Sequence, residues 1–423
     1  MAPAAPAAAA VPGQFYGLPG LTQFMELPDA QVGVTVVGAQ ASTTNVNTLS
    51  QLTQDNITFW WEMDVAIAQT YTAGTGSETT SPFWPWSFIS SCQLQLQSMY
   101  SNVQVDNGYD LMLFEMIWPT RSPRVSQYGG DLGANPAEKA FAAGPPQAGV
   151  PYNGAVNPNL FITTPSATPQ TQNPNFCVTL PGSIYLDEYW DMDMEGNLQS
   201  DVAFPARVSP QYMAGAARQI TPKVVLAAGS VTDESTGPYN LVSNATIAFS
   251  ATFSLRRVGL YSTENPQVDP PVYNWQYQRI SKSYPLIGSP LIIKLDESAQ
   301  ILGLFMRFWD PTLNTGVGGP IAITNFIELQ LLYGGSLNRF DDSPKTMQRR
   351  LFDQHRLLLP AGVLCWDLSL DPDGSGKTTN AYALNTLVTA SPTIKITYAS
   401  GYTPGTGSKV IIGYHELKYV LAQ

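Results

Sequence analysis

The sequence predicts an all-β protein, and three observations support that fold class. The 423 residues include 34 Gly, 34 Pro and 20 Tyr but only 13% charged residues, which favours short strands joined by turns over helix bundles. The apolar runs are short, often alternate with polar residues, and are separated by Gly, Asn, Ser or Pro clusters. Two blocks of such runs follow one another in a similar order. A hydrophobic content of 44% is ample for two cores.

The first block contains eight predicted strands and the second contains six, with a helix among them. We expect the strands of the first block at 32–37, 57–71, 88–105, 111–118, 176–180, 184–193, 223–227 and 246–260. Those of the second block are expected at 291–295, 301–309, 321–333, 363–370, 393–398 and 409–421. Two antiparallel blocks of this size suit two tandem eight-stranded jelly rolls, because paired sheets protect the strand edges that an open sheet exposes.

An internal duplication is indicated by the ends of the two blocks. Leu180-Pro181 lines up with Leu359-Pro360, then the run starting at Pro222 with the run starting at Pro392, then the strand ending at Leu260 with the strand ending at Leu421. We predict three parts: an Ala/Pro-rich tail at 1–28, a first jelly roll at 29–262 with a long loop insertion at 119–174, and a second jelly roll at 263–423.

A short helix is predicted before a late strand of the second jelly roll. Ser343 is a good N-cap and Pro344 suits the first helical position, where its missing N–H costs nothing. Met347, Leu351 and Leu358 fall on one side of this helix, and Arg349, Arg350 and Arg356 lie mostly elsewhere. The basic residues around the helix are expected to form a solvated face, with a subunit contact as the alternative.

The distribution of charge argues against nucleic-acid binding. The net charge is −11, and no Lys or Arg precedes Arg121, whereas nine acidic residues do. Binding to phosphates needs clusters of Lys and Arg, which this chain does not supply. The N-terminus lacks the positive region of a signal peptide and no run of eighteen apolar residues occurs. We therefore expect a soluble, non-secreted product that does not hold a genome directly.

The residues that most often carry chemistry are few. Cys92, Cys177 and Cys365 sit among apolar residues with no CxxC pair, so we expect small buried hydrophobic side chains. His355 and His415 have no partner at metal-ligand spacing and are predicted to be structural.

The segment 371–378 resembles two ligand-binding loops without matching either. As a phosphate loop, it has Asp371 where the first glycine is needed. As an EF-hand, it has Tyr382 at the position of the bidentate Glu. We predict a turn.

One acidic run could support catalysis. If 187–195 is a strand, Asp191, Asp193 and Glu195 share one face at a spacing of about 6.5–7 Å, from which two carboxylates could flank a glycosidic bond. The run resembles the ExDxE motif of laminarinase-like jelly-roll glycoside hydrolases, which would make Asp191 and Glu195 the nucleophile and the acid/base. An acidic strand edge or a subunit contact is the favoured interpretation, and cation binding by this run stays open.

Four short segments in the C-terminal part resemble a known family, the major capsid proteins of the tectivirus type. The segments are Asn338 to Thr346, Gln348-Arg349-Arg350, Pro360 to Asp367 and Ile411 to Glu416. They are similar to the second jelly roll of these double-jelly-roll proteins, whose lineage includes adenovirus hexon.

This resemblance implies a structural protein of the virion of a tailless icosahedral virus, such as a bacteriophage, made in the host cytoplasm. The chain would form homotrimers, each a pseudo-hexameric capsomer that contacts neighbouring capsomers, with minor capsid or penton proteins and an internal membrane as further partners. The helix from Ser343 to Leu358 would belong to the base of the subunit. No catalytic, cofactor-binding or metal-binding residue is predicted. A jelly-roll glycoside hydrolase or carbohydrate-binding protein using Asp191, Asp193 and Glu195 is the alternative.

Overall fold

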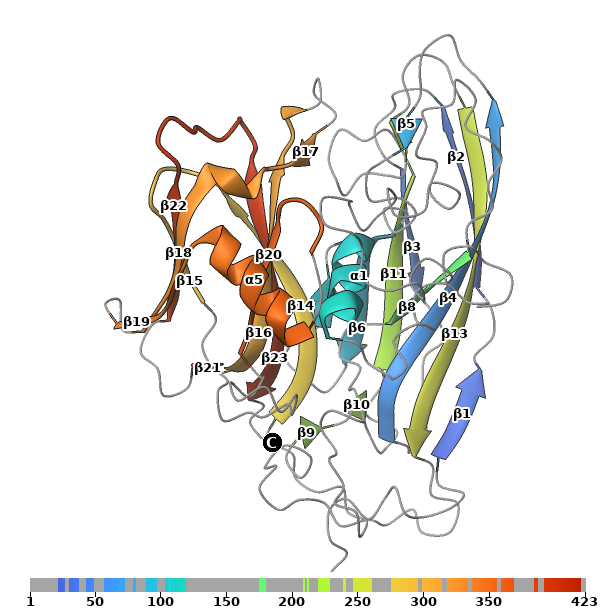
Figure 1. The fold of residues 1–423 in the computed structure, drawn as a ribbon. Coiled ribbons are helices and arrows are strands. Elements are labelled where there is room, and N and C mark those ends of the chain that lie inside the picture. The colour runs from blue at the N-terminus through green and yellow to red at the C-terminus, as the bar shows by residue number, and fades with distance from the viewer. Residues whose placement is uncertain are drawn as a thin grey trace, which may run out of the picture.

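The computed structural model describes part of the chain, and Figure 1 shows its arrangement. The described residues are 22–26, 30–37, 43–48, 57–72, 79–80, 89–96, 103–105, 107–118, 175–179, 208–209, 211–212, 220–228, 239–240, 246–260, 275–295, 299–313, 318–333, 337–355, 359–368, 384–386 and 392–419. Side chains are described mainly within 107–118 and 278–416.

The first jelly roll consists of two antiparallel sheets. In one, the strand order is β2-β13-β4-β8, and β1 also pairs with β13; in the other it is β3-β11-β6-β7. The strands are β1 (Thr22–Glu26), β2 (Ala30–Val37), β3 (Thr43–Thr48), β4 (Ile57–Thr72), β6 (Ile89–Leu96), β7 (Val103–Val105), β8 (Asn175–Thr179), β11 (Ile220–Ala228) and β13 (Thr246–Leu260).

The second jelly roll repeats this topology. One sheet has the order β14-β23-β16-β20, and the other has the order β15-β22-β18-β19. The strands are β14 (Trp275–Pro285), β15 (Leu291–Lys294), β16 (Ala299–Asp310), β18 (Phe326–Tyr333), β19 (Leu337–Asp342), β20 (Val363–Asp367), β22 (Thr393–Tyr398) and β23 (Lys409–Tyr419). The eight main strands of each jelly roll, numbered along the chain from β2 in the first and from β14 in the second, have the same order in the sheets. One sheet is 1-8-3-6 and the other is 2-7-4-5.

Six short strands form additional pairings. They are β5 (Thr79–Thr80), β9 (Val208–Ser209), β10 (Gln211–Tyr212), β12 (Tyr239–Asn240), β17 (Gly319–Pro320) and β21 (Leu384–Asn385), and a 3-10 turn, η4 (Ile323–Asn325), precedes β18. Most join neighbours within one jelly roll, but β9 pairs in parallel with β14 and so links the two halves of the chain.

Two irregularities recur at the same places in both jelly rolls. Where β4 pairs with β13, Phe59 is left out of the ladder, and where β16 pairs with β23, Leu302 is left out. Ser90 is likewise skipped between β6 and β11, as Ile327 is between β18 and β22. Because bulges are specific features of a strand pair, their repetition supports the predicted duplication and aligns the two halves residue by residue.

The core of the second jelly roll lies between its two sheets. Strand β22 alternates between buried and half-buried residues, and β15 between buried and exposed residues, as expected for strands with one wet face. In contrast, nearly every residue of β16 is buried, because β16 has the core on one face and the first half of the chain on the other.

The strand predicted at 111–118 is wrong. These residues belong to helix α1 (Gly108–Ile117), where Asn107 acts as N-cap by accepting a hydrogen bond from the backbone N–H of Tyr109 at 2.8 Å. The run Leu111 to Trp118 is apolar on almost every side, so its pattern cannot separate a buried helix from a buried strand. This segment is apolar on all sides because α1 lies between the two jelly rolls and is covered by both (Figure 1).

The second helix was predicted correctly. Helix α5 (Pro344–His355) begins after Ser343, whose hydroxyl accepts a hydrogen bond from the backbone N–H of Thr346 at 3.2 Å. Met347 and Leu351 are buried as expected, and Leu358 lies outside the described residues. Helix α1 follows β7 and precedes β8, and helix α5 follows β19 and precedes β20. Because β7 corresponds to β19 and β8 to β20, α1 and α5 are topological counterparts.

Most predicted strands are confirmed to within a few residues, and those at 246–260 and 393–398 have the predicted bounds. The strand expected at 88–105 is two strands, β6 and β7, and the one expected at 321–333 begins as η4. Strands β3, β14 and β19 were missed, and β1 lies inside the segment predicted as a tail. The strand at 184–193 lies outside the described residues, and the domain boundaries stay a prediction.

The Leu-Pro correspondence was drawn at the wrong register. Leu359-Pro360 precedes β20, whereas Leu180-Pro181 follows β8, the counterpart of β20. The other two alignments join true counterparts, β11 with β22 and β13 with β23.

Among the described residues, no helix is long and apolar enough to cross a bilayer.

Candidate functional site: the joint between the two jelly rolls

The most elaborate cluster of side chains in the described part of the chain joins helix α1 to the β14-β23-β16-β20 sheet. We call this cluster the joint. It consists of Asp110, Phe114 and Trp118 on the helix, and of the residues beneath them on the sheet: Arg279, Gly303, Phe305, Arg307, Asp367, Gly413 and His415. Spacings of four residues place the three helix residues on one face.

Trp118 covers one row that crosses all four strands of the sheet. Arg279, His415, Gly303 and Asp367 are direct neighbours in this row. The indole ring stacks on His415 with centroids 4.7 Å apart, and its N–H donates to Asp367 Oδ2 at 3.2 Å. Arg279 donates to the Trp118 carbonyl oxygen. A single residue from the first half of the chain, through its ring and its backbone carbonyl, therefore contacts four strands of the second.

Glycine makes this close approach possible. A Cβ atom at Gly303 would overlap the Trp118 ring, and one at Gly413 would overlap the ring of Phe305. In the next row, Phe305 meets Phe114 edge to face at 4.9 Å. The sheet is thus shaped for the helix at two positions, as glycine within a strand often indicates.

A buried ion pair closes the joint at the N-terminal end of α1. Arg307 Nε donates to Asp110 Oδ1 at 2.8 Å, and the two side chains are only 2% and 1% exposed. The Arg307 guanidinium also lies over the ring of Tyr109, 5.6 Å from its centroid. Since burying a charge without a partner is costly, the pair fixes how the helix lies along β16.

His415 is neutral at ordinary pH. Burial and the neighbouring Arg279 guanidinium hold the pKa of His415 well below its usual value, although Asp367 acts in the opposite direction. The ring is almost fully buried against Trp118. A role in packing was predicted for this residue, and the structure confirms it.

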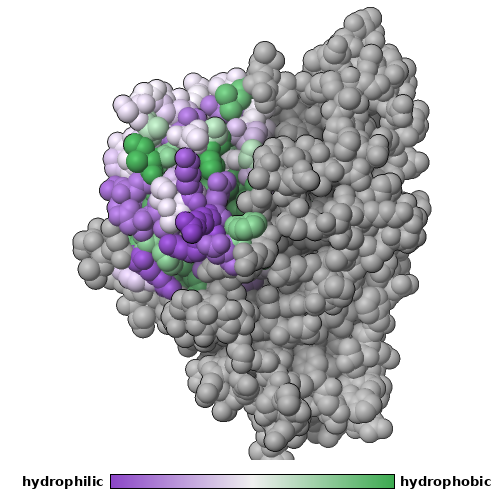
Figure 2. Space-filling model, in the orientation of Figure 1, coloured by the Kyte–Doolittle hydropathy of each residue, from purple (hydrophilic) through white to green (hydrophobic). Residues whose placement is uncertain are grey.

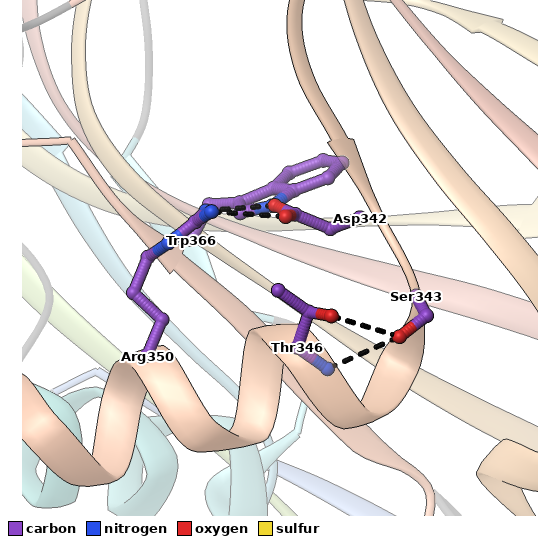
Figure 3. Close-up of polar contacts among 5 residues, drawn as sticks. All are labelled: Asp342, Ser343, Thr346, Arg350 and Trp366. Atoms are coloured by element: carbon purple, nitrogen blue, oxygen red, sulfur yellow. Dashed lines mark hydrogen bonds and ion pairs between the residues drawn. The ribbon is translucent and has the colours of Figure 1, made fainter.

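Helix α5 is anchored to its own jelly roll by a polar cluster (Figure 3). Both carboxylate oxygens of Asp342 accept from Arg350, at 2.7 and 2.9 Å, and Oδ2 also accepts from the indole N–H of Trp366 at 2.9 Å. The Arg350 guanidinium lies 4.9 Å from the Phe340 ring centroid. Asp342 is buried, so these bonds replace the water that its carboxylate loses.

The other residues singled out in the sequence do not gather at a site in the described structure. Cys92 and Cys365 are buried free thiols whose pKa values are raised by burial, as expected for inert cysteines. The following lie outside the described residues or side chains: Cys177, His355, the acidic run with Asp191, Asp193 and Glu195, the loop at 119–174 and the turn at 371–378. Within the described residues, no cluster of three or more His, Cys, Asp or Glu could hold a metal ion.

The sequence analysis missed the joint. The signal that could have found its helix is the succession Asn107-Gly108-Tyr109-Asp110, an N-cap followed by an acidic residue in the first turn. The partners on the sheet carry no comparable local signal, since Arg307, Asp367 and His415 are far apart in sequence.

Comparisons with known proteins support the fold. Neither a protein-family model nor a curated protein matches the sequence. Among solved structures, the major capsid protein of Sulfolobus turreted icosahedral virus is similar at a TM-score of 0.50 and 11% identity, over 95% of this chain and 97% of that chain.

Two further structures are similar along nearly their whole length. A capsid structure of the virus PBCV-1 matches at a TM-score of 0.49 and 9% identity, over 94% of this chain and 95% of that chain. The major capsid protein P2 of bacteriophage PM2 matches at 0.43 and 9% identity, over 95% and 98%. The strand order and the match to the virus of Sulfolobus show that the chain has the double-jelly-roll fold of viral major capsid proteins. They give no support to the glycoside hydrolase alternative.

Proposed function

We propose that this chain is the major capsid protein of an icosahedral virus, a structural protein of the virion without catalytic activity. The observation that carries the proposal is the double jelly roll, which spans nearly the whole chain and nearly the whole of a viral major capsid protein of similar fold. The joint supports it, because the buried aromatic and charged residues on this face of the second jelly roll hold the first jelly roll in place.

In this proposal the chain acts by assembling with itself. Three copies would give six jelly rolls in a ring, a pseudo-hexameric capsomer that tiles the shell by contacts with neighbouring capsomers. The acidic N-terminal part, with no Lys or Arg before Arg121, suits a shell that leaves the genome to other components. An internal membrane, minor capsid or penton proteins, and a bacteriophage host stay predictions.

Light scattering coupled to gel filtration tests the proposal. Three chains of 45.9 kDa give a trimer of about 138 kDa, and negative-stain images of that species should show a hexagonal outline. A chain that stays monomeric at every concentration would count against a capsid function. Hydrolysis of β-glucan by the purified protein, lost in the Asp191→Asn and Glu195→Gln variants, would instead favour the hydrolase.

A further inference from the structure

Helices α1 and α5 hold the same topological position, but only α1 is covered by a second jelly roll. The Arg349 side chain on α5 is 85% exposed and that of Asp353 is 60% exposed, and Phe352 is 38% exposed. Lys345 and Thr346 are also exposed. Figure 2 shows this face, where hydrophilic residues gather over the area that α5 occupies in Figure 1.

The N-caps define which residues of α5 correspond to the joint residues of α1. Counting from Asn107 and from Ser343, Asp110 corresponds to Thr346 and Phe114 to Arg350. The positions of α5 that match the joint are therefore Thr346 and Arg350, but the Arg350 guanidinium is already paired with Asp342 of its own jelly roll. The positive charge that this surface offers to a partner comes from the exposed Lys345 and Arg349 beside them, whereas the matching face of α1 is apolar and acidic.

The shared bulges define which positions of the first jelly roll correspond to the sheet side of the joint. Counting from Phe59 and from Leu302, Glu62 takes the place of Phe305, and Asp64 takes the place of Arg307. Glu26 and Arg256 stand in one row with Glu62. Three acidic residues and one arginine thus stand in the rows that correspond to the Phe114 and Asp110 rows. These rows of the first jelly roll are therefore mainly acidic, whereas the joint has Arg307 on its sheet.

We propose that α5 docks on a second copy of this chain, against the β13-β4 region of the neighbour's first jelly roll, and there repeats the joint between subunits. This inference rests on the proposed function and deepens it by naming the two surfaces that meet. Charge complementarity and continuity with the joint inside the chain support it. Such a contact is head-to-tail, and head-to-tail contacts close into rings when the rotation per step allows it. Contacts within a chain, through α1, would then alternate with contacts between chains, through α5, and close a ring of jelly rolls made from one kind of chain.

A charge exchange tests the contact. The Lys345→Glu/Arg349→Glu variant and the Glu62→Lys/Asp64→Lys variant should each weaken trimers roughly tenfold or more, because like charges would face each other. The chain that carries all four substitutions should recover most of the trimer. Oligomer mass from light scattering over a dilution series is the readout, and circular dichroism confirms that each variant is folded.

The matched control compares two single variants that make the same change at an exposed lysine. Lys345→Glu lies on α5 and should weaken the trimer, whereas Lys294→Glu lies on β15, in the sheet away from α1. The Lys294→Glu variant should remain as trimeric as the parent chain. If Lys294→Glu weakened the trimer as much as the α5 variant does, a general effect of charge would explain the result and the proposed contact would be rejected.

A disulfide cross-link provides a readout independent of charge. Asp110 and Arg307 are in contact at 2.8 Å, so their counterparts Thr346 and Asp64 should lie close together across the subunit contact. Oxidation of the Thr346→Cys/Asp64→Cys chain should give covalent dimers and trimers on a non-reducing gel. The Ile292→Cys/Asp64→Cys chain, with its cysteine on β15, should not.

Two outcomes separate this inference from the function on which it rests. A parent chain that forms no trimer would reject both. A trimeric parent whose variants all remain trimeric, and whose Thr346→Cys/Asp64→Cys chain does not cross-link between subunits, would reject the α5 contact and leave the capsid function standing.

Discussion

The two helices that join the sheets of each jelly roll have the same place in the topology and opposite surroundings. Helix α1 is buried on its described positions, where it meets the other jelly roll through aromatic rings and a buried ion pair. Helix α5 buries Met347 and Leu351 against its own jelly roll and exposes charged residues on the other side. A repeated element is therefore specialised by its neighbour: the apolar helix makes a permanent contact, and the amphipathic helix leaves a polar face for water or for another copy.

The largest expected difference concerns an aspartate on each helix. Asp110→Ala leaves the buried Arg307 without its carboxylate and should lower the free energy of unfolding by about 3–5 kcal/mol. Asp353→Ala removes a solvent-exposed i,i+4 ion pair with Arg349, 3.7 Å apart, and should change the free energy of unfolding by about 0–0.5 kcal/mol. Urea denaturation of both variants measures this. Equal effects would show that the two helices are not specialised as described.

The close approach of α1 to the sheet can be tested at a glycine. Gly303→Ala adds a Cβ that overlaps the Trp118 ring and should cost about 1–3 kcal/mol. In a Trp118→Ala background the same change should cost much less, because the ring is gone. A double-mutant cycle by urea denaturation measures this coupling. Additive effects of the two substitutions would mean that Trp118 does not lie on Gly303.

The buried His415 should make the folded chain less stable in acid. The pKa of His415 is lower in the folded chain than its usual value of 6.5, so the unfolded chain binds the proton first as pH falls. The free energy of unfolding should therefore be unaffected by this group well above pH 6.5, and should decrease below it by up to about 1.4 kcal/mol per pH unit.

A series of denaturation curves between pH 5 and 8 measures this slope. The variant His415→Gln should show a shallower slope below pH 6.5, because glutamine does not titrate in this range. A slope that stays unchanged in this variant would show that His415 is not the group that takes up the proton on unfolding.

The smallest expected difference between the two helices concerns their N-caps. Ser343→Ala should cost about 1 kcal/mol, because the hydroxyl that accepts from Thr346 N is lost at an exposed position. Asn107→Ala should cost more, about 2 kcal/mol, because the backbone N–H of Tyr109 is buried and would lose its partner. Thermal melting of both variants gives the order, and a larger loss for Ser343→Ala would contradict it.

Much of the fold could be predicted where local signals and the tertiary structure agree. The strands at 246–260 and 393–398 have β-branched alternation and clear ends, and both form as predicted. Helix α5 has a capping serine, a proline at its first position and one apolar face, three signals that act within a few residues.

The failure at α1 has a physical cause. An element buried on all sides needs no polar face, so its sequence loses the period by which helices and strands differ. Leu111 to Trp118 is such a run. The Leu-Pro correspondence failed for a related reason: two residues can match by chance, whereas a shared bulge is a property of the paired strands.

The sequence by itself determined the all-β class, most strands, the second helix, the inert cysteines and the absence of a basic arm before Arg121, because composition, period and capping act locally. Three facts follow only from contacts in the folded chain: Gly108–Ile117 is a helix, Arg307, Asp367 and His415 meet at that helix and its C-cap Trp118, and α1 and α5 are counterparts. These facts depend on contacts between residues far apart in the chain, where a side chain takes its partner and its charge state from the neighbour that folding brings to it.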